Sequence, residues 1–283
     1  MWVYTGMGAR LEWALLNYFV DFHIANGYTF VMPPHLLNYE SGYAAGQFPK
    51  FEDDVYFTNT GATVGKNVDL RKNKFLIPTS ETALINMHRG ESILAENLPI
   101  KYAAYSPCYR AEGGGYGANE RGMIRGHQFN KIEMFIFCSP EQSPKLFDEL
   151  VANAERLIEG LGLHYQNVAL AAGDCSAAMA KTYDTEIFIP SMKGYKEVSS
   201  ISNAHCYQAR RANIKAKTVT QECGEGACRK VVHSEYLHTL NASGLATSRL
   251  IPAIVEQFQN EDGTVNVPEV LQKYLGGVKV ITK

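Results

Sequence analysis

The sequence predicts an α+β protein with a mainly antiparallel sheet flanked by helices. Apolar residues recur at helical spacing in three stretches, and strand-like runs lie between them. Helices and strands do not alternate regularly, which disfavours a doubly wound parallel sheet. The chain has 283 residues, of which 46% are hydrophobic and 20% charged. That composition is typical of a folded globular protein and excludes general disorder.

Three amphipathic helices are predicted from the apolar spacing. The first covers residues 11–22. The second begins with Ser143 as its cap and Pro144 at the first helical position, and it ends near Gly162. The third covers residues 250–258.

Strands are predicted where short apolar or alternating runs lie between these helices. They are residues 28–32, 102–109, 131–137, 187–190 and 195–202. The run 131–137 alternates along its length, so Ile132, Met134 and Ile136 should share one face. Lys131, Glu133 and Phe135 should then share the other face.

Charge and cysteine content exclude several classes of protein. Lys and Arg number 27 and Asp and Glu 29, giving a net charge of −2 without the basic footprint of a dedicated nucleic-acid-binding module. The six cysteines are scattered, unlike a secreted disulfide framework. No run is long and apolar enough for a membrane helix, and the N-terminus is unlike a signal peptide. We therefore expect a reduced, cytoplasmic protein without a membrane partner.

The most informative stretch is residues 109–133, YRAEGGGYGANERGMIRGHQFNKIE. Arg110 and Glu112 are two residues apart on the predicted strand, so both should point to one face. Glycines within residues 113–117 then form a loop.

Cationic and aromatic residues follow this loop and suggest a polyphosphate site. Arg125 would contact phosphates, and Phe129 would stack on a base. The glycine cluster matches neither GxxxxGK[ST] nor GxGxxG, so it is not a P-loop or a Rossmann fingerprint.

These residues resemble motif 2 of class II aminoacyl-tRNA synthetases. The form GxIRxHQFxKxE, ending at Glu133, is that of seryl-tRNA synthetase. Further stretches resemble the seryl enzymes in the same order along the chain: residues 6–15 and 27–34 (motif 1 and its lead-in helix), 78–81 (the TxE serine loop), 183–190, 197–211 and 239–249 (motif 3). The ordered set is far more specific than any single motif.

The resemblance implies a set of ATP contacts. Arg110 matches the arginine that holds the α-phosphate and the amino-acid carboxylate, and Glu112 matches the contact to adenine. Phe129 matches the ring that stacks on adenine, Arg249 the γ-phosphate contact, and Arg125 a β/γ-phosphate contact. Arg110, Glu112 and Arg249 are the expected catalytic residues.

The resemblance also implies a serine pocket and a magnesium ion. Residues that match serine contacts are Thr79, Glu81, Arg110, Glu133 and Ser243. Glu197 and Ser200 match positions that coordinate Mg²⁺ on the phosphates. Taken singly, four of these residues would also fit ordinary structural roles: Thr79 and Ser243 as helix caps, Arg249 as a solvated cation, and Glu197 as a surface carboxylate.

Several positions depart from the family pattern. Ile201 stands where a Cys is usual, residues 205–207 differ, Ala242 replaces a Gly, and Thr247-Ser248 replaces Val-Gly. We expect these positions to lie in the layer behind the residues that line the pocket and to affect substrate size or rate. The segment before His238 is also longer than usual.

That longer segment contains two cysteines. Cys223, Cys228 and His233 are weak candidates for metal ligands because their spacing is not a good zinc signature.

The implied protein is a homodimeric serine–tRNA ligase catalytic core spanning residues 1–283. It would use ATP and Mg²⁺ to form seryl-adenylate and would transfer the seryl group to tRNA(Ser). No heptad stretch corresponds to the family's N-terminal coiled-coil arm, so tRNA binding is expected to be weak. The alternatives are a paralogue that passes an activated amino acid to a carrier protein or another acceptor, and a non-catalytic, ligand-sensing paralogue.

Overall fold

The computed structural model describes residues 2–58, 70–112, 122–224 and 227–282. Its helices are α1 (Gly6–Ala25), α2 (Tyr39–Ala44), α3 (Glu81–Leu84), α4 (Ser143–Leu161), α5 (Tyr207–Ala212), α6 (Thr247–Gln257) and α7 (Glu269–Gln272). Its strands are β1 (Thr29–Val31), β2 (Leu36–Asn38), β3 (Phe57–Thr58), β4 (Lys74–Leu76), β5 (Ser92–Leu94), β6 (Ile100–Tyr109), β7 (Gln128–Cys138), β8 (Tyr165–Ala169), β9 (Lys181–Ile189), β10 (Gly194–His205), β11 (Lys215–Gly224), β12 (Ala227–Tyr236), β13 (His238–Ala246), β14 (Val265–Asn266) and β15 (Val280–Ile281).

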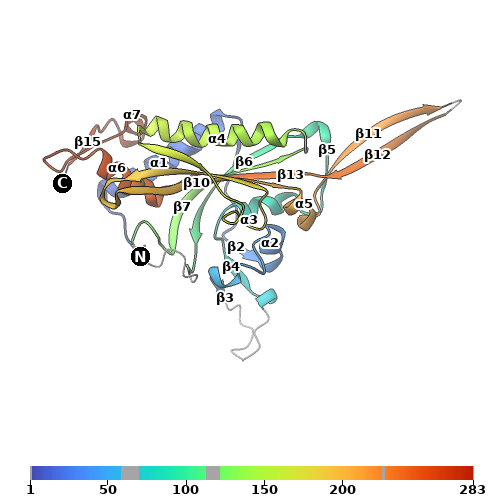
Figure 1. Ribbon diagram of the computed structural model, residues 1–283, viewed down its shortest axis with the longest axis horizontal. Coiled ribbons are helices and arrows are strands. Elements are labelled where there is room, and N and C mark those ends of the chain that lie inside the picture. The colour runs from blue at the N-terminus through green and yellow to red at the C-terminus, as the bar shows by residue number, and fades with distance from the viewer. Residues whose placement is uncertain (1, 59–69, 113–121, 225–226, 283) are drawn as a thin grey trace.

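A large sheet forms the centre of the molecule (Figure 1). In the described part of the chain it has seven strands in the order β1-β6-β7-β13-β10-β9-β8. The pair β1–β6 is parallel, and the other neighbours are antiparallel. The predicted α+β class with a mainly antiparallel sheet is therefore confirmed.

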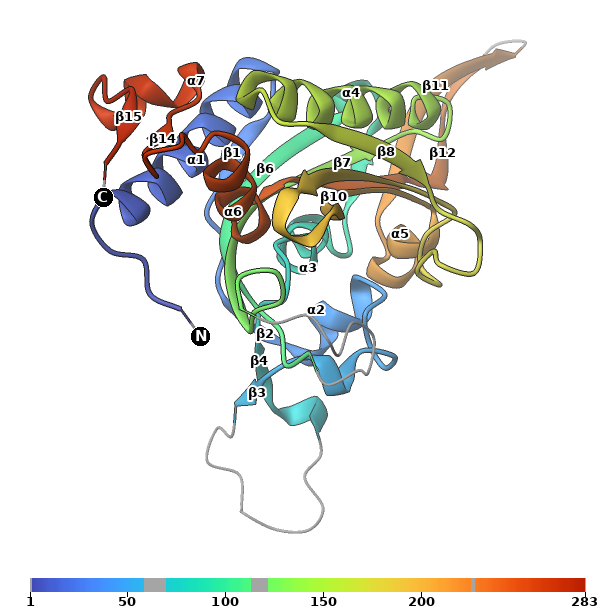
Figure 2. The same ribbon diagram turned by 60° about the vertical axis from the view of Figure 1, so that its left-hand side comes forward.

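Helices cover the two faces of this sheet unequally. Helices α1, α4 and α6 lie over one face, and the shorter α2, α3 and α5 lie on the other side (Figures 1 and 2). Strand β7 contributes to both cores, as its alternation predicts. Ile132, Met134 and Ile136 are buried in the larger core, whereas Phe135 and Phe137 are buried in the smaller one.

All three predicted helices are present, but the predicted N-terminal cap of one of them is wrong. Ser143 does not cap α4: it is the first helical residue, and its Oγ accepts a hydrogen bond of 2.6 Å from Asn203 Nδ2. The hydroxyl that the sequence suggested as a cap is therefore hydrogen-bonded to a side chain of a neighbouring strand. Gly162 ends the helix in the left-handed conformation, with φ of 71°. The strand predicted over residues 187–190 begins earlier, at residue 181, and ends before Pro190.

A third layer lies beneath the large sheet. Strands β2, β4 and β3 form a small antiparallel sheet around Phe48 and Phe75, both buried. Ile77, in the same cluster, accepts a hydrogen bond from Tyr109 N at the end of β6. This layer places residues 78–81 opposite the large sheet, so the two layers can enclose a pocket. No helix in the described ranges combines the length and hydropathy needed to cross a bilayer.

Helix α1 is fixed to the sheet by a close contact between His23 and Gly244. Burial lowers the pKa of His23 to about 4, so the ring is neutral near pH 7. Its Nε2 lies 2.7 Å from Gly244 O and donates the hydrogen bond. A Cβ at position 244 would lie 2.4 Å from that nitrogen, so only glycine fits.

We expect Gly244→Ala to destabilise the fold by about 1–3 kcal/mol, because the added methyl must displace a buried ring. Gly8→Ala is the matched control: it lies in α1 with nothing within 4 Å of its Cβ position. That control should be neutral or slightly stabilising. Urea unfolding measures both, and an equal effect of the two substitutions would contradict the argument.

Candidate functional site

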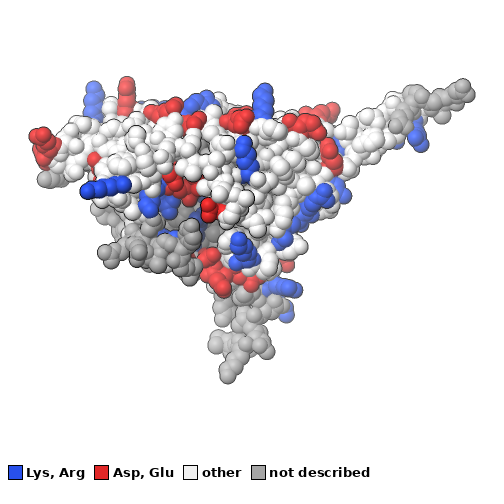
Figure 3. All heavy atoms as spheres, viewed as in Figure 1, with Lys and Arg blue, Asp and Glu red and all other residues white. Residues whose placement is uncertain are grey.

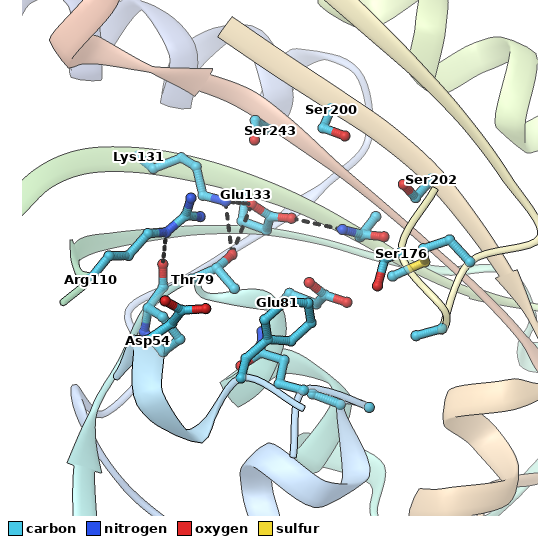
Figure 4. A pocket seen from close by; sticks show the side chains of 18 of the residues that line it. Asp54, Thr79, Glu81, Arg110, Lys131, Glu133, Ser176, Ser200, Ser202 and Ser243 are labelled. Carbon is cyan, nitrogen blue, oxygen red and sulfur yellow. Dashed lines mark hydrogen bonds and ion pairs between the residues drawn. The ribbon is translucent and has the colours of Figure 1, made fainter. Parts of the chain in front are cut away.

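A cavity of about 460 Å³ lies between the large sheet and the layer that contains α2 and α3. Its walls carry many polar side chains (Figure 4). In that view Ser200, Ser202 and Ser243 lie on one side, Glu81 and Asp54 on the opposite side, and Lys131 and Arg110 between them. The cavity is therefore a polar cleft suited to a charged ligand.

All but two of the predicted site residues line this cavity. Those lining it are Thr79, Glu81, Arg110, Glu112, Arg125, Glu133, Glu197, Ser200 and Ser243. The other two contact lining residues. Phe129 has its ring centroid 5.1 Å from the Arg110 guanidinium carbon. Arg249 Nη1 donates to Glu197 O at 2.6 Å and lies 3.8 Å from Glu197 Oε2.

Strand alternation decides which residues face the cavity. Ser200 and Ser202 on β10 line it, while Ile201 between them is fully buried in the larger core. Ala242 on β13 likewise packs in that core, between the lining residues Asn241 and Ser243. Ile201 and Ala242 thus lie directly behind the residues that line the cavity, which agrees with the expected position, and their effect on substrate size or rate stays a prediction.

The segment after β6 departs from the sequence interpretation. Arg110 and Glu112 lie beyond the end of the strand, and Glu112 is in the left-handed region with φ of 51°. Both residues line the same cavity, but strand alternation is not the cause. Backbone hydrogen bonds from Arg110 N to His127 O and from Ala111 N to Asp54 O hold this segment. The glycine loop at 113–117 lies outside the described residues.

The arginines of this segment are already oriented by the protein. Arg110 Nε donates to Pro78 O at 3.2 Å, and its guanidinium stacks over Phe129. Arg125 Nη2 forms an ion pair of 2.7 Å with Glu112 Oε2, and both side chains are about four-fifths buried. These contacts restrict the arginine rotamers, so these side chains lose less conformational entropy when a ligand binds.

A buried ion pair lies at the centre of the cavity wall. Lys131 Nζ is 2.5 Å from Glu133 Oε2 and donates to Thr79 Oγ1 at 2.8 Å. Thr79 Oγ1 in turn donates to Glu133 Oε2 at 3.3 Å, and Asn241 Nδ2 donates to Glu133 Oε1 at 3.3 Å. Lys131 and Asn241 were not among the predicted site residues, although Lys131 belongs to the quoted HQFxKxE motif.

Gln208 is a further residue that the sequence interpretation missed. It is fully buried, and its Nε2 donates to Glu81 Oε1 at 2.5 Å and to Ala45 O at 3.0 Å. Its Oε1 accepts a hydrogen bond of 2.6 Å from Thr239 Oγ1. All these contacts join distant parts of the chain, so Gln208 holds Glu81 at the cavity wall. The position of Gln208 within the 197–211 motif was its only sequence signal.

Two carboxyl groups in or beside the cavity have strongly raised pKa values. Burial, and then the nearby charge of Glu133, raises the pKa of Glu81 to about 7. Burial, and then the charge of Glu197, raises the pKa of Asp184 to about 7. Asp184 Oδ1 is buried without a hydrogen-bond partner. Groups with such perturbed pKa values cluster at functional sites.

The predicted magnesium position has a suitable chemistry. Glu197 and Ser200 both line the cavity and offer oxygen ligands, and the Asp184 carboxyl lies close enough to Glu197 for their charges to interact. Mg²⁺ is commonly bound by one or two carboxylates together with substrate phosphates, so these residues fit that ion. Among the described residues, no group of three or more His, Cys, Asp or Glu side chains forms a metal cage.

The weak alternative of a metal at the inserted cysteines is not supported. Cys228 is disulfide-bonded, and Cys223 is its direct cross-strand neighbour in the β11–β12 hairpin. His233 pairs with Thr218, which places it on the other face of that hairpin. Backbone register thus separates the histidine from Cys228.

The raised pKa of Glu81 gives a prediction for stability against pH. The folded protein keeps this proton up to about pH 7, whereas the unfolded chain loses it near the ordinary value of 4.5. Stability therefore falls as pH rises between these two values, by up to about 3 kcal/mol. Glu81→Gln keeps the acceptor for Gln208 and removes the titration. The free energy of unfolding of both proteins is measured by urea at a series of pH values. The difference between the two free energies should grow between these two pH values and stay constant at higher pH. A difference that is the same at every pH would contradict the raised pKa.

The buried ion pair gives a second prediction. Glu133→Ala leaves the Lys131 ammonium buried without its carboxylate and should cost about 3–5 kcal/mol. Replacing both residues, Lys131→Met with Glu133→Ala, should cost clearly less than the sum of the two single changes. A double-mutant cycle by urea unfolding measures the coupling. Additive losses would show that the two side chains are energetically independent.

Comparison with known proteins places this site in a family. Residues 65–258 match the model of the tRNA synthetase class II core domain (G, H, P, S and T). The chain is 56% identical to Serine–tRNA ligase 2 of Clostridium acetobutylicum over 279 residues, covering 99% of this chain and 62% of that protein. It is 44% identical to the serine–tRNA ligase of Desulforapulum autotrophicum, covering 99% of this chain and 61% of the relative.

Solved structures agree with these relatives. The seryl-tRNA synthetase of Pyrococcus horikoshii, complexed with ATP, matches 97% of this chain and 56% of its own, with a TM-score of 0.83 and 35% identity. The cytoplasmic serine–tRNA ligase of Naegleria fowleri, in complex with AMP, matches 98% of this chain and 61% of its own, with a TM-score of 0.84 and 35% identity. The chain spans about three fifths of the length of its curated relatives. On this evidence the chain belongs to the class II tRNA synthetase core-domain family.

Proposed function

We propose that this chain is the catalytic core of a serine–tRNA ligase. It activates serine with ATP to give seryl-adenylate and pyrophosphate, and the seryl group then passes to tRNA(Ser). The observation that carries the proposal is one cavity that joins a compact polar pocket, around Thr79 and Glu133, to a group of oriented arginines. The serine–tRNA ligases among its relatives support the same reaction.

The polar pocket suits the side chain and amino group of serine. Glu133, Thr79 and Ser243 line the cavity together and are all more than nine-tenths buried. A serine hydroxyl placed there would exchange hydrogen bonds with these groups. Alanine has no hydroxyl, so it would gain fewer hydrogen bonds from this pocket than serine does. Threonine would be rejected by the small volume.

The arginines suit the triphosphate. One serine carboxylate oxygen attacks the α-phosphorus of ATP, and the bond from that phosphorus to the pyrophosphate oxygen breaks. Charge on the phosphoryl oxygens is the main demand of this step, so positioning and positive charge matter more than proton transfer. Arg110 would hold the α-phosphate and the serine carboxylate, and Arg249 the γ-phosphate. Arg125 would contact the β/γ-phosphates, while Glu112 and Phe129 bind adenine. The Pyrococcus horikoshii synthetase is complexed with ATP, which supports ATP as the ligand of this chain.

Mg²⁺ would be held by Glu197 and Ser200 together with the phosphates. When bound, it neutralises part of the phosphate charge. Arg249 contacts Glu197 through both its backbone oxygen and its carboxylate, so the arginine also orients this carboxylate.

The proposed protein works as a cytoplasmic homodimer. Large apolar side chains on and beside the N-terminal helix are exposed in the single chain: Trp13 is 60% exposed and Met32 is 70% exposed. Such exposure around one element is typical of an interface. Among the described cysteines, Cys108, Cys138, Cys175 and Cys206 are free, which suits a reducing compartment. The disulfide at Cys228 is the exception.

Serine-dependent exchange of pyrophosphate into ATP tests the proposal. The wild-type chain should catalyse exchange, and Arg110→Ala and Arg249→Ala should each reduce it by about 10²-fold or more, because each removes a charge-assisted phosphate contact. Arg89→Ala is the matched control: Arg89 is exposed and is not among the residues that line the cavity.

Each outcome separates the candidate functions. Absence of wild-type exchange, with retained binding of serine or ATP, would favour the ligand-sensing alternative and refute the enzyme. Exchange that persists in both arginine variants would refute the residue roles. If exchange occurs, transfer of labelled serine to tRNA or to an acyl carrier protein identifies the acceptor.

A further inference from the structure

A long hairpin projects from the body of the molecule, away from the cavity. Strands β11 and β12 pair over ten residues each, and they form the extended arm in Figure 1. Strand β5 joins this sheet only beside residues 215–217. The rest of the hairpin, within its described residues, is a two-stranded ribbon. An isolated ribbon of this kind is only marginally stable in water, and here β5 supports its base while the disulfide at Cys228 lies near its tip.

The charges of this ribbon differ between its two faces. Directly opposite residues of an antiparallel pair lie on the same face. One face carries the pairs Lys215–Tyr236, Lys217–Ser234, Val219–Val232 and Gln221–Lys230. It therefore holds three lysines and no acidic residue among these pairs. Glu235 pairs with Ala216 and so belongs to the other face.

The lysine-bearing face also exposes apolar surface. Val219 and Val232 are opposite each other and are 48% and 60% exposed. Lysines on an edge strand protect it from aggregation. If the lysines served only to protect the edge, acidic residues could also occur among these pairs. An exposed valine pair among the lysines would also have no role in such protection. The combination is typical of a surface that binds a polyanion with some apolar character.

A cation from a separate element extends this face at its base. Tyr236 has the Lys215 ammonium 5.0 Å from its ring centroid and the Arg210 guanidinium carbon 4.7 Å from it. Arg210 belongs to α5, so the basic surface continues from the hairpin onto the body. Figure 3 shows Lys and Arg side chains gathered below the hairpin and around its base, with Asp and Glu above the base.

We propose that this face of the β11–β12 hairpin binds the sugar–phosphate backbone of RNA. The lysines and Arg210 neutralise phosphates, and the valine pair and Tyr236 contact sugars or unstacked bases. This inference rests on the proposed function, in which the acceptor is a tRNA. A second copy of the chain is a poorer occupant, because an isologous contact would bring two sets of lysines into one interface.

The test compares two variants with the same change in net charge. The first is the triple variant Lys215→Gln, Lys217→Gln, Lys230→Gln. The matched control is Lys145→Gln, Lys193→Gln, Lys279→Gln, which alters three exposed lysines outside the hairpin. Binding of unfractionated tRNA is measured by filter retention across a salt series, and serine-dependent pyrophosphate exchange is measured in parallel.

The hairpin variant should bind tRNA at least tenfold more weakly at moderate salt. Its plot of log K against log salt should be less steep by about two to three, since three phosphate contacts are lost. The control should keep the wild-type affinity and slope, and pyrophosphate exchange should be unchanged in both variants. An unchanged tRNA affinity in the hairpin variant, or an equal loss in the control, would overturn the proposal.

Further measurements separate this proposal from other occupants and from the proposed function. Competition by poly-glutamate as effective as that by tRNA would indicate an acidic protein partner and would overturn the RNA assignment. A change of sedimentation coefficient in the hairpin variant, without loss of tRNA binding, would indicate a contact between copies and would also overturn it. Loss of tRNA binding in the hairpin variant, when the wild type shows no pyrophosphate exchange, would refute the proposed function and retain the hairpin inference.

Discussion

The burial of strand β7 on both of its faces is the constraint on which the structure depends. A strand covered on one side by long helices must present aliphatic residues there, and Ile132, Met134 and Ile136 do so. The opposite side is shared between two aromatic residues of the smaller core and the ion pair of Lys131 and Glu133. A shift of one residue in register would exchange the two sides, so the same alternation determines both the core and the cavity.

Burial of the polar groups of the cavity lowers the stability of the fold. Glu81 and Asp184 both have raised pKa values because burial disfavours their charged forms. The Lys131–Glu133 pair loses hydration when it is buried, and its mutual attraction opposes this cost. Such groups are worth retaining when their geometry serves a ligand, because rigid and desolvated partners recognise a small polar substrate better than mobile ones. The hydrogen bonds from Thr79, Asn241 and Gln208 provide that rigidity.

The cavity and the hairpin represent two ways of using polar surface. In the cavity, opposite charges lie close together and are buried, so their contribution is geometric and depends little on salt. On the hairpin, like charges lie on an exposed ribbon, so their contribution is long-range and falls steeply with salt. The proposed function, which joins a small amino acid to a large polyanion, would use both. Strand pairing gives each a definite position, through β7 and β13 for the cavity and through β11 and β12 for the hairpin.

The sequence alone determined the fold class, the three long helices, five strands of the large sheet, and nine of the residues that line the cavity. Periodicity is a local property, and the ordered motifs identify residues such as Arg110 and Glu133 one by one. Only the tertiary structure decided that Gln208 holds Glu81, that Arg249 reaches Glu197, and that Glu112 leaves the strand in a left-handed conformation. These features depend on contacts between segments far apart in the chain. A local pattern records which face of an element is buried, but it does not record which other element covers that face.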